Sequence, residues 1–351
     1  MRYAKLETGA RYNLASSGVK DCRIEELGAS WDDLALHGPN AYGYGPLVER
    51  IAARYAVPEA CVVMPGGGCS FANHLALAAL LEPGDEVLIE DPTYELLLAT
   101  LGTLSAKTLT FERRAEDGFR IDPDAVARAL TPATRLIVMT DLHNPSGAAA
   151  GDVEVAEVAR LAQAQGAHVL IDEVYRELTF TDGSVRTAFD PSGSVVVTSS
   201  LTKAYGLSGL RCGWVLAPAP LAERMRRLND LFGVASAHVT ERLAVVALDH
   251  LPALRARAAA IVEANRQAYQ ALLGGHAALE QQMFPDASTV FPRLIDRDAD
   301  VFAERLAREF DTCVTPGRFF ARPEHLRIGL GGDPATTREG LERVARALQV
   351  Q

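Results

Sequence analysis

Short apolar runs alternate with helical patterns over the middle of the chain, from about residue 60 to residue 217. The runs are CVVMPG, EVLIED, KTLTFE, RLIVMT, HVLIDE, SVVVTSS and CGWVLAP. Most are separated by helical patterns such as FANHLALAALLEPGD and VAEVARLAQAQG. Nearly continuous apolar strands joined by helices are typical of a parallel sheet that is covered on both faces. The pattern therefore predicts an α/β fold with a mainly parallel, seven-stranded sheet.

The last two runs leave an alternative open. Only the stretch around Lys203 separates them, so the two runs are also compatible with an antiparallel edge of the sheet.

The pattern of apolar and polar residues along the chain changes after Pro218. A long helical stretch, from about Leu251 to Leu273, is rich in alanine and arginine, and the short strand-like pieces TVFPRL and HLRIGLG follow it. The first forty residues contain few periodic segments, and we expect them to pack against this part. The sequence therefore predicts a large domain at 40–245 and a smaller α+β domain built from 1–39 and 246–351.

Composition narrows the possible partners. The chain of 351 residues carries 45 acidic and 35 basic side chains, and its net charge of -10 opposes binding to nucleic acid or to an anionic membrane. The five cysteines are scattered and form no CxxC pair, which indicates reduced thiols in the cytoplasm rather than disulfides or a metal site. The N-terminal stretch shows no apolar core of a signal peptide, and no apolar run is long enough to span a membrane.

Residues that directly follow the predicted strands are candidates for chemistry, because ligands bind beyond the carboxyl ends of such strands. In GGGCS, from Gly66 to Ser70, glycines before a helix can offer backbone N–H groups to a phosphate, although a tight turn capped by Ser70 is equally compatible. In EDPTYELL, Tyr94 opens the next helix and can stack on a flat ligand or simply pack.

Two further strand ends carry polar side chains. In DLHNPSG, Pro145 holds Asn144 out of the helical region, so its amide can point at a ligand; an ordinary Asn-Pro turn is the alternative. Asp172 ends the run HVLID and needs a partner if it is buried, or it caps a helix. Tyr175 lies three residues further on, on the same side if a helical turn begins there.

Lys203 stands in the stretch TSSLTKAYGLSGLRCGW, directly after a predicted strand. Burial lowers the pKa of a lysine and makes its amine a nucleophile. Ser200, Thr202 and Arg211 add hydroxyl groups and a guanidinium that suit a doubly charged phosphate. A solvated surface lysine would not explain these neighbours.

Taken in order, the motifs G-x-S, P-x-Y, N-P-x-G, D-x-x-Y, S-x-T-K and G-L-R-x-G resemble those of the fold-type-I pyridoxal-phosphate enzymes. More narrowly, they are similar to the class I/II aminotransferases of the aspartate and histidinol-phosphate type. The resemblance runs from about Tyr42 to Arg327, which is most of the chain.

The resemblance implies a role for each motif residue. Lys203 would hold the cofactor as an internal aldimine and move the proton, Asp172 would pair with the pyridinium nitrogen, and Tyr94 would stack on the ring. Asn144 and Tyr175 would bind the 3-oxygen of the ring. The remaining residues would hold the cofactor phosphate; they are Gly68, Cys69, Ser70, Ser200, Thr202 and Arg211.

The resemblance also implies roles for three other positions. Arg327 in HLRIGLG matches the arginine that binds the substrate α-carboxylate, with a surface position as the alternative. AYGYGPL matches the segment whose tyrosine reaches the phosphate of the neighbouring subunit; Tyr42 is preferred over Tyr44, and a homodimer with shared sites follows. YNLASSGVKD resembles the N-terminal lid, which would bring Gly18 to the substrate carboxylate.

The sequence departs from the family pattern at two places. Phe71 replaces a polar residue after the phosphate loop, and His143 precedes Asn144, where it either lines the pocket or is satisfied within the loop. A second arginine of the dicarboxylate-specific type is not recognisable, which weighs against an aspartate aminotransferase.

The resemblance predicts a cytoplasmic aminotransferase of amino-acid metabolism that moves the amino group of an L-amino acid to a 2-oxo acid by a ping-pong mechanism. The same residues serve a decarboxylase, a β-lyase or a cyclase, because all of these stabilise a carbanion at Cα. A non-enzymatic regulator module on this fold is a further alternative, which the acidic charge disfavours.

Overall fold

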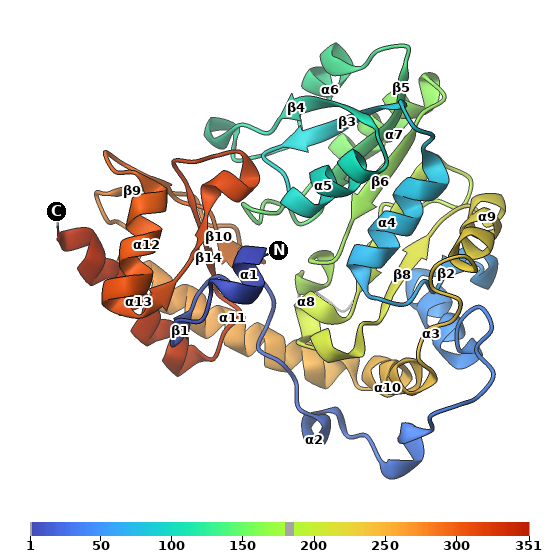
Figure 1. Cartoon of the computed structure of the whole chain (residues 1–351), viewed down its shortest axis with the longest axis horizontal. Coiled ribbons are helices and arrows are strands. Elements are labelled where there is room, and N and C mark those ends of the chain that lie inside the picture. Colours follow the sequence, from blue (N-terminus) through green and yellow to red (C-terminus); the bar gives the residue numbers. More distant parts are fainter. Residues whose placement is uncertain (1, 180–185, 351) are drawn as a thin grey trace.

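Seven strands form one sheet in the larger part of the molecule (Figure 1). The computed structural model describes residues 2–179 and 186–350. Across the sheet the strands are β2 (Val62–Val63), β8 (Gly213–Leu216), β7 (Val195–Ser200), β6 (His168–Asp172), β5 (Thr134–Thr140), β3 (Glu86–Asp91) and β4 (Lys107–Glu112). Each apolar run in the sequence matches one strand, so the predicted α/β fold with seven strands is confirmed.

One strand of the sheet runs against its neighbours. The pairs among β3, β4, β5, β6 and β7 are parallel, whereas β8 is antiparallel to both β7 and β2. The link of about a dozen residues between β7 and β8 contains only short helical turns and lacks the long helix of a parallel crossover. The alternative correctly gave β7 and β8 an antiparallel pairing. It was wrong to place them at the edge of the sheet, because β2 lies outside β8.

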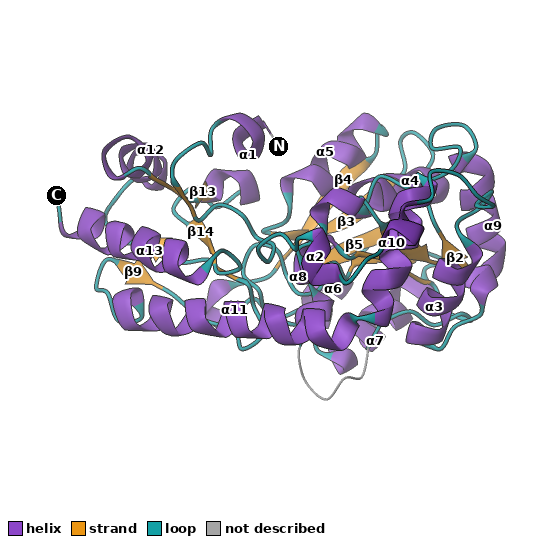
Figure 2. Cartoon of the chain, turned by 90° about the horizontal axis from the view of Figure 1, so that it is seen from below, coloured by secondary structure: helices purple, strands orange, loops and turns teal. Residues whose placement is uncertain are grey.

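Alternate residues of the strands face two separate cores. Val87, Leu136 and Val196 belong to one apolar cluster, while their neighbours Leu88 and Ile137 belong to the other. The first face is covered by α4 (Cys69–Leu80), α5 (Glu95–Thr103) and α9 (Ala219–Asn229). The second is covered by α3 (Gly45–Tyr55), α6 (Pro123–Ala129), α7 (Asp152–Ala164), α8 (Thr202–Tyr205), α10 (His238–Asp249) and the first half of α11 (Leu251–Leu273). The layers are visible in Figure 2.

A smaller α+β part lies beside the sheet, and α11 runs along both (Figures 1 and 2). Its core gathers around α12 (Ala299–Phe310), α13 (Pro334–Gln349) and the second half of α11. Its strands are β10 (Thr289–Val290), β14 (Leu326–Gly329) and β13 (Thr315–Pro316) in one antiparallel sheet, β9 (Leu279–Glu280) with β11 (Arg293–Leu294), and β1 (Tyr12–Asn13) with β12 (Thr312–Cys313).

The N-terminal forty residues divide between the two cores. After α1 (Arg2–Leu6), β1 pairs with β12 and Leu14 enters the core of the small part. Leu27, at the end of α2 (Ile24–Leu27), instead packs into the core of the large part. The expectation that the whole segment packs on the small domain therefore holds only for its first half. The division into 1–39, 40–245 and 246–351 stays a prediction.

No helix in the described ranges 2–179 and 186–350 has the length and apolar character that a membrane span needs.

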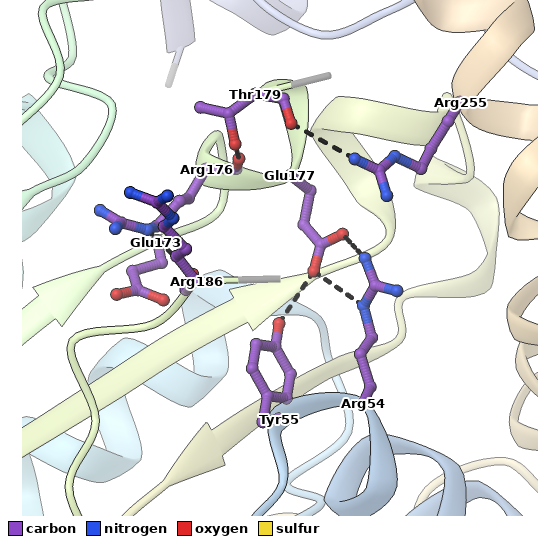
Figure 3. A pocket seen from close by; sticks show the side chains of 8 residues that line it. All are labelled: Arg54, Tyr55, Glu173, Arg176, Glu177, Thr179, Arg186 and Arg255. Atoms are coloured by element: carbon purple, nitrogen blue, oxygen red, sulfur yellow. Dashed lines mark hydrogen bonds and ion pairs between the residues drawn. The ribbon is translucent and has the colours of Figure 1, made fainter. Parts of the chain in front are cut away.

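A group of charged side chains lies between α3 and the short helix η4 (Arg176–Leu178), as Figure 3 shows. The carboxylate of Glu177 accepts hydrogen bonds from Arg54 Nε at 3.1 Å and from the hydroxyl of Tyr55 at 3.0 Å. Arg255 donates to the carbonyl of Thr179 at 3.3 Å. These charges satisfy one another, and we interpret the group as a brace between α3 and the loop after β6.

Glu173 borders this group and gives the stability of the fold a dependence on pH. Its side chain is 2% exposed, and burial raises its pKa to about 8, although Arg176 and the Ala188 N–H act in the opposite direction. A carboxyl group whose pKa is raised on folding stabilises the protein below its unfolded pKa and loses this contribution as the pH rises through the folded value. We expect the unfolding free energy of the wild type to fall between pH 5 and 8.5. In Glu173→Gln this fall should be smaller by on the order of 3 kcal/mol, as measured by urea titrations.

Glu157→Gln is the matched control for this prediction. Glu157 is exposed on α7, and its hydrogen bond to Arg160 lowers its pKa, so it titrates below the tested range. Equal slopes for wild type and Glu173→Gln between pH 5 and 8.5 would contradict the assignment to Glu173.

Candidate active site

A cavity of about 410 Å³ lies at the carboxyl ends of the central strands, and residues of the small part and of the N-terminal segment close it. Asp172 ends β6 and Ser200 ends β7, and both line it. Arg327 on β14 reaches it from the small part, and Ser17 reaches it from the N-terminal segment. The site therefore forms where the two parts and the N-terminal segment meet.

The cavity collects most of the residues that the sequence singles out. Those that line it are Cys69, Ser70, Tyr94, Asn144, Asp172, Tyr175, Ser200, Thr202, Lys203, Arg211 and Arg327. Gly68 precedes Cys69 in the loop at its border, and Tyr42 does not line it. The motifs come from separate strand ends, and the parallel arrangement brings them to one edge of the sheet.

Lys203 lies on α8, the single turn that follows β7. Its Nζ donates a hydrogen bond to Ser17 Oγ at 3.3 Å, and this hydroxyl lies 2.6 Å from the hydroxyl of Tyr175. Gly18 packs against the lysine stem, because a Cβ at this position would lie 3.3 Å from Lys203 Cδ. The amine is thus half-buried and connected to two hydroxyl groups.

The carboxylate of Asp172 is buried and accepts hydrogen bonds at both oxygens. Asn73 Nδ2 donates to Oδ2 at 2.7 Å, while the Val174 N–H and Cys69 Sγ donate to Oδ1 at 3.0 and 3.3 Å. Burial raises the pKa of Asp172, and these donors and the charge of Lys203 counteract the rise. A cation placed beside this carboxylate would be stabilised.

The glycine loop before α4 is shaped to receive an anion. Gly66, Gly67 and Gly68 all have positive φ, and a Cβ at Gly68 would lie 2.8 Å from Arg211 Nη2. Arg211 Nη2 also donates to the Gly67 carbonyl at 2.8 Å. Thr202 Oγ1 is buried and has no hydrogen-bond partner among the described residues. A hydroxyl without a partner in the described residues, a guanidinium and the start of a twelve-residue helix therefore border the same cavity.

Arg327 is buried on β14 and lines the cavity from the small part. Its Nη1 donates to Asn144 Oδ1 at 3.0 Å, and its Nη2 donates to the Ala15 carbonyl at 3.0 Å and to Thr315 Oγ1 at 3.3 Å. Its Nε has no partner in the described part of the chain. Burial lowers the pKa of Arg327, so an incoming carboxylate would meet a guanidinium with little solvent around it.

A buried ion pair supports Asn144 through the hydroxyl group of Thr140. Its backbone N–H donates to Thr140 Oγ1 at 3.0 Å, and that hydroxyl donates to Glu90 at 2.6 Å. Glu90 pairs with Arg113 at 2.7 Å, and neither side chain has any exposed surface. The charged pair therefore anchors the loop that carries the amide.

Residues 33–344 match the model of the family described as aminotransferase class I and II. The chain belongs to this family. The arginine–pyruvate transaminase AruH of Pseudomonas aeruginosa is 31% identical over 371 residues, which cover 97% of this chain and 91% of that protein. The capreomycidine synthase of Streptomyces vinaceus is 30% identical over 350 residues, which cover 97% and 90%.

The fold is shared with solved structures of the family. A PLP-dependent aminotransferase from Streptococcus suis 89-1591 superposes with a TM-score of 0.90 at 25% identity, and the match covers 99% of this chain and 96% of that one. The protein is thus a pyridoxal-phosphate-dependent aminotransferase of class I/II with fold type I, as the resemblance predicted.

The described residues fit this cofactor. The hydroxyl of Thr202 that lacks a partner, the positive-φ glycines and Arg211 suit the phosphate. The buried Asp172 suits a protonated ring nitrogen, and its carboxylate lies on the same cavity as Lys203.

Two residues that the sequence singled out, His143 and Tyr42, lie outside the cavity. His143 is 1% exposed and satisfied within its loop, with ring nitrogens 2.6 Å from Ser146 Oγ and 2.9 Å from the Pro92 carbonyl, so it does not line the cavity. Tyr42 is 41% exposed and accepts a hydrogen bond from Arg227 at 2.7 Å. Its role at a neighbouring subunit stays a prediction.

Sequence reasoning missed several residues of the site. Ser17, Asn73, Glu95 and Thr315 all line the cavity, and Thr315 also contacts Arg327. Asn73 and Cys69 are four residues apart, so they share one face of α4, and this spacing was the one signal available. Ser17 and Thr315 reach the site only through the packing of the small part.

Proposed function

We propose that this aminotransferase holds pyridoxal phosphate through the motif residues and uses Lys203 as the catalytic amine. The observation that carries the proposal is the convergence of these residues from separate strand ends on one cavity. When bound, the cofactor supplies an electron sink that stabilises a carbanion at the substrate Cα and carries the amino group between the two half-reactions.

In this proposal each of these residues would have one task at the cofactor. Lys203 would carry it covalently, Asp172 would hold the ring nitrogen, and Tyr94 would support the ring. Asn144 and Tyr175 would bind the 3-oxygen. The phosphate would be surrounded by the backbone of Gly68 and Cys69 at the start of α4 and by Ser70, Ser200, Thr202 and Arg211.

The amine of Lys203 moves the proton at the substrate Cα. The hydroxyl of Ser17 receives a hydrogen bond from Nζ and connects it to Tyr175. We infer that this contact orients the amine towards the reacting centre, where proximity converts a weak base into an effective one.

Arg327 binds the substrate α-carboxylate. Its guanidinium is already oriented by Asn144, Ala15 and Thr315, and this reduces the entropy lost on binding. A planar fork with buried donors suits a carboxylate in two-point contact.

We propose that the amino donor has a cationic side chain. Glu95 opens α5 directly after Tyr94 and lines the cavity. Among the lining residues that the structure describes, Arg211 and Arg327 are the only arginines, and both have a task already. A relative that is 31% identical over nearly the whole chain is an arginine–pyruvate transaminase. We infer that the carboxylate of Glu95 would meet the side chain of a bound donor, where it would favour a guanidinium or an ammonium group.

Glu95→Gln tests this donor class. We expect kcat/KM for arginine to fall about 10–100-fold, since a hydrogen bond to a charged group contributes roughly 1.5–3 kcal/mol. The value for alanine should change less than about threefold. Steady-state kinetics with pyruvate or 2-oxoglutarate as acceptor measure both.

Glu304→Gln, an exposed position on α12, is the control and should leave both values unchanged. An equal loss with arginine and alanine would refute the role of Glu95 in donor choice.

A cyclase is the second candidate, because capreomycidine synthase is 30% identical over 97% of the chain. Mass spectrometry of the products separates the two. Transamination of arginine yields a 2-oxo acid and the amine of the acceptor, whereas a cyclisation keeps the α-nitrogen and needs no acceptor.

We further propose a homodimer in which Tyr42 reaches the phosphate of the second site, and a cytoplasmic role in amino-acid biosynthesis. The five free cysteines and the exposed position of Tyr42 support these points.

A further inference from the structure

Asn73 lines the cavity next to Asp172, and it belongs to none of the sequence motifs. Its side chain is 5% exposed and lies between two polar groups of the sheet. Nδ2 donates to Asp172 Oδ2 at 2.7 Å, and Oδ1 accepts from Thr198 Oγ1 at 2.5 Å. Because an ionised carboxylate only accepts hydrogen bonds, the amide group has a single orientation that satisfies both contacts.

The contact depends on the way in which α4 and the sheet pack. Asn73 and Cys69 lie one turn apart on α4, and each donates to a different oxygen of Asp172. Thr198 is the direct partner of Asp172 in the register of β6 and β7. The carboxylate is therefore held by a helix on one side and oriented through the neighbouring strand on the other.

Asp172 needs this support because it is 5% exposed. Burial alone favours the neutral acid and raises its pKa, whereas hydrogen bonds to the charged form lower it, and the contact from Asn73 is the largest of these opposing effects. The other titratable groups that act on Asp172 are Cys69 on α4, Lys203 on α8 and Tyr94 before α5.

We propose that Asn73 is a positioning residue that keeps the carboxylate of Asp172 ionised and directed at the ring nitrogen of the cofactor. The inference rests on the proposed role of Asp172. Asn73 lines the cavity, and in this inference it acts through its hydrogen bond to the carboxylate of Asp172. By holding the negative charge in place, it determines how firmly the ring nitrogen keeps its proton, and with it the strength of the electron sink.

Asn73→Leu tests the proposal, because leucine has a similar volume and no polar group. We expect kcat to fall about 10–100-fold with the KM of the amino acid unchanged, and the dissociation constant of the cofactor, measured by equilibrium dialysis, to rise about tenfold. The acid limb of the pH profile of kcat should move about one pH unit upward, since the pKa of Asp172 rises when a donor is lost.

Two comparisons separate this effect from a general loss of packing. Asn265→Leu removes a buried asparagine of α11 that donates to Leu330 and Gly332, so it should lower stability and leave the pH profile unmoved. On an Asp172→Asn background, Asn73→Leu should cause little further loss of kcat, because both act through one group.

Thr198→Val keeps the asparagine and removes only the contact that orients it. It should shift the same quantities in the same direction by a smaller factor, and it decides the matter if Asn73→Leu does not fold. The inference about Asn73 would be overturned if Thr198→Val and Asn73→Leu left both the acid limb and the cofactor affinity unchanged while Asp172→Asn was strongly impaired. The proposed function would stand in that case. A fully active Asp172→Asn would overturn the proposed function of Asp172 instead.

Discussion

Lys203→Ala is expected to lower the rate of transamination at least about 10⁴-fold, because the variant loses the residue that we propose as both the covalent carrier of the cofactor and the base that moves the Cα proton. Lys203 Nζ is the one lysine amine on the cavity among the described residues. Activity is measured by the formation of 2-oxo acid from the donor, under conditions of saturating cofactor.

The attachment itself is measured separately. Borohydride reduction of the wild-type holoenzyme, followed by digestion and mass spectrometry, should place the cofactor on the peptide that contains Lys203. Lys107→Ala, at an exposed position on β4, should keep both label and activity. Added methylamine should restore part of the activity of Lys203→Ala, since a small amine can occupy the space that the side chain leaves.

A label on any other lysine, or full activity in Lys203→Ala, would contradict the proposed mechanism.

Asp172→Asn is expected to lower kcat about 10³-fold while the KM of the amino acid changes little. The substitution keeps the size of the side chain and removes the negative charge that, in the proposed function, holds a proton on the ring nitrogen. Breaking one partner out of a buried charge pair costs roughly 3–5 kcal/mol, and this range corresponds to a rate loss of two to four powers of ten. The cofactor should also bind more weakly.

The absorption spectrum of the holoenzyme gives a readout that a loss of folding alone would not produce. The band of the bound cofactor should respond to pH differently in Asp172→Asn than in wild type, because the protonation of the ring is no longer coupled to the carboxylate. Glu177→Gln is a suitable comparison, since Glu177 is a buried carboxylate of the brace near β6 and does not line the cavity. An unchanged kcat in Asp172→Asn would contradict the role.

The strands were predictable because each is a short apolar run bounded by turn-forming residues. Val87 to Ile89 and Leu136 to Val138 are buried on both faces of the sheet, so their burial leaves a continuous apolar signal in the sequence. The place of β2 was not predictable, because its two residues carry no information about which edge they join.

The packing of the N-terminal segment was also not predictable from the sequence. Leu14 and Leu27 look alike in sequence, yet one packs into the small core and the other into the large core. The choice depends on where β12 and the large core lie in space, and local periodicity does not encode this.

The sequence by itself determined the class of the fold and most of the residues around the cavity. The motifs of Asn144, Asp172 and Lys203 lie at or shortly after the ends of β5, β6 and β7, and these parallel strands bring their carboxyl ends to one edge, so order along the chain was enough to bring the three residues together. The contacts that tune these groups were decided only by the tertiary structure. Asn73 meets Asp172, and Ser17 meets Lys203, across more than ninety residues of chain. Such contacts depend on how a helix or a terminal segment packs on the sheet, and the direction of a side chain after packing cannot be derived from the spacing of residues.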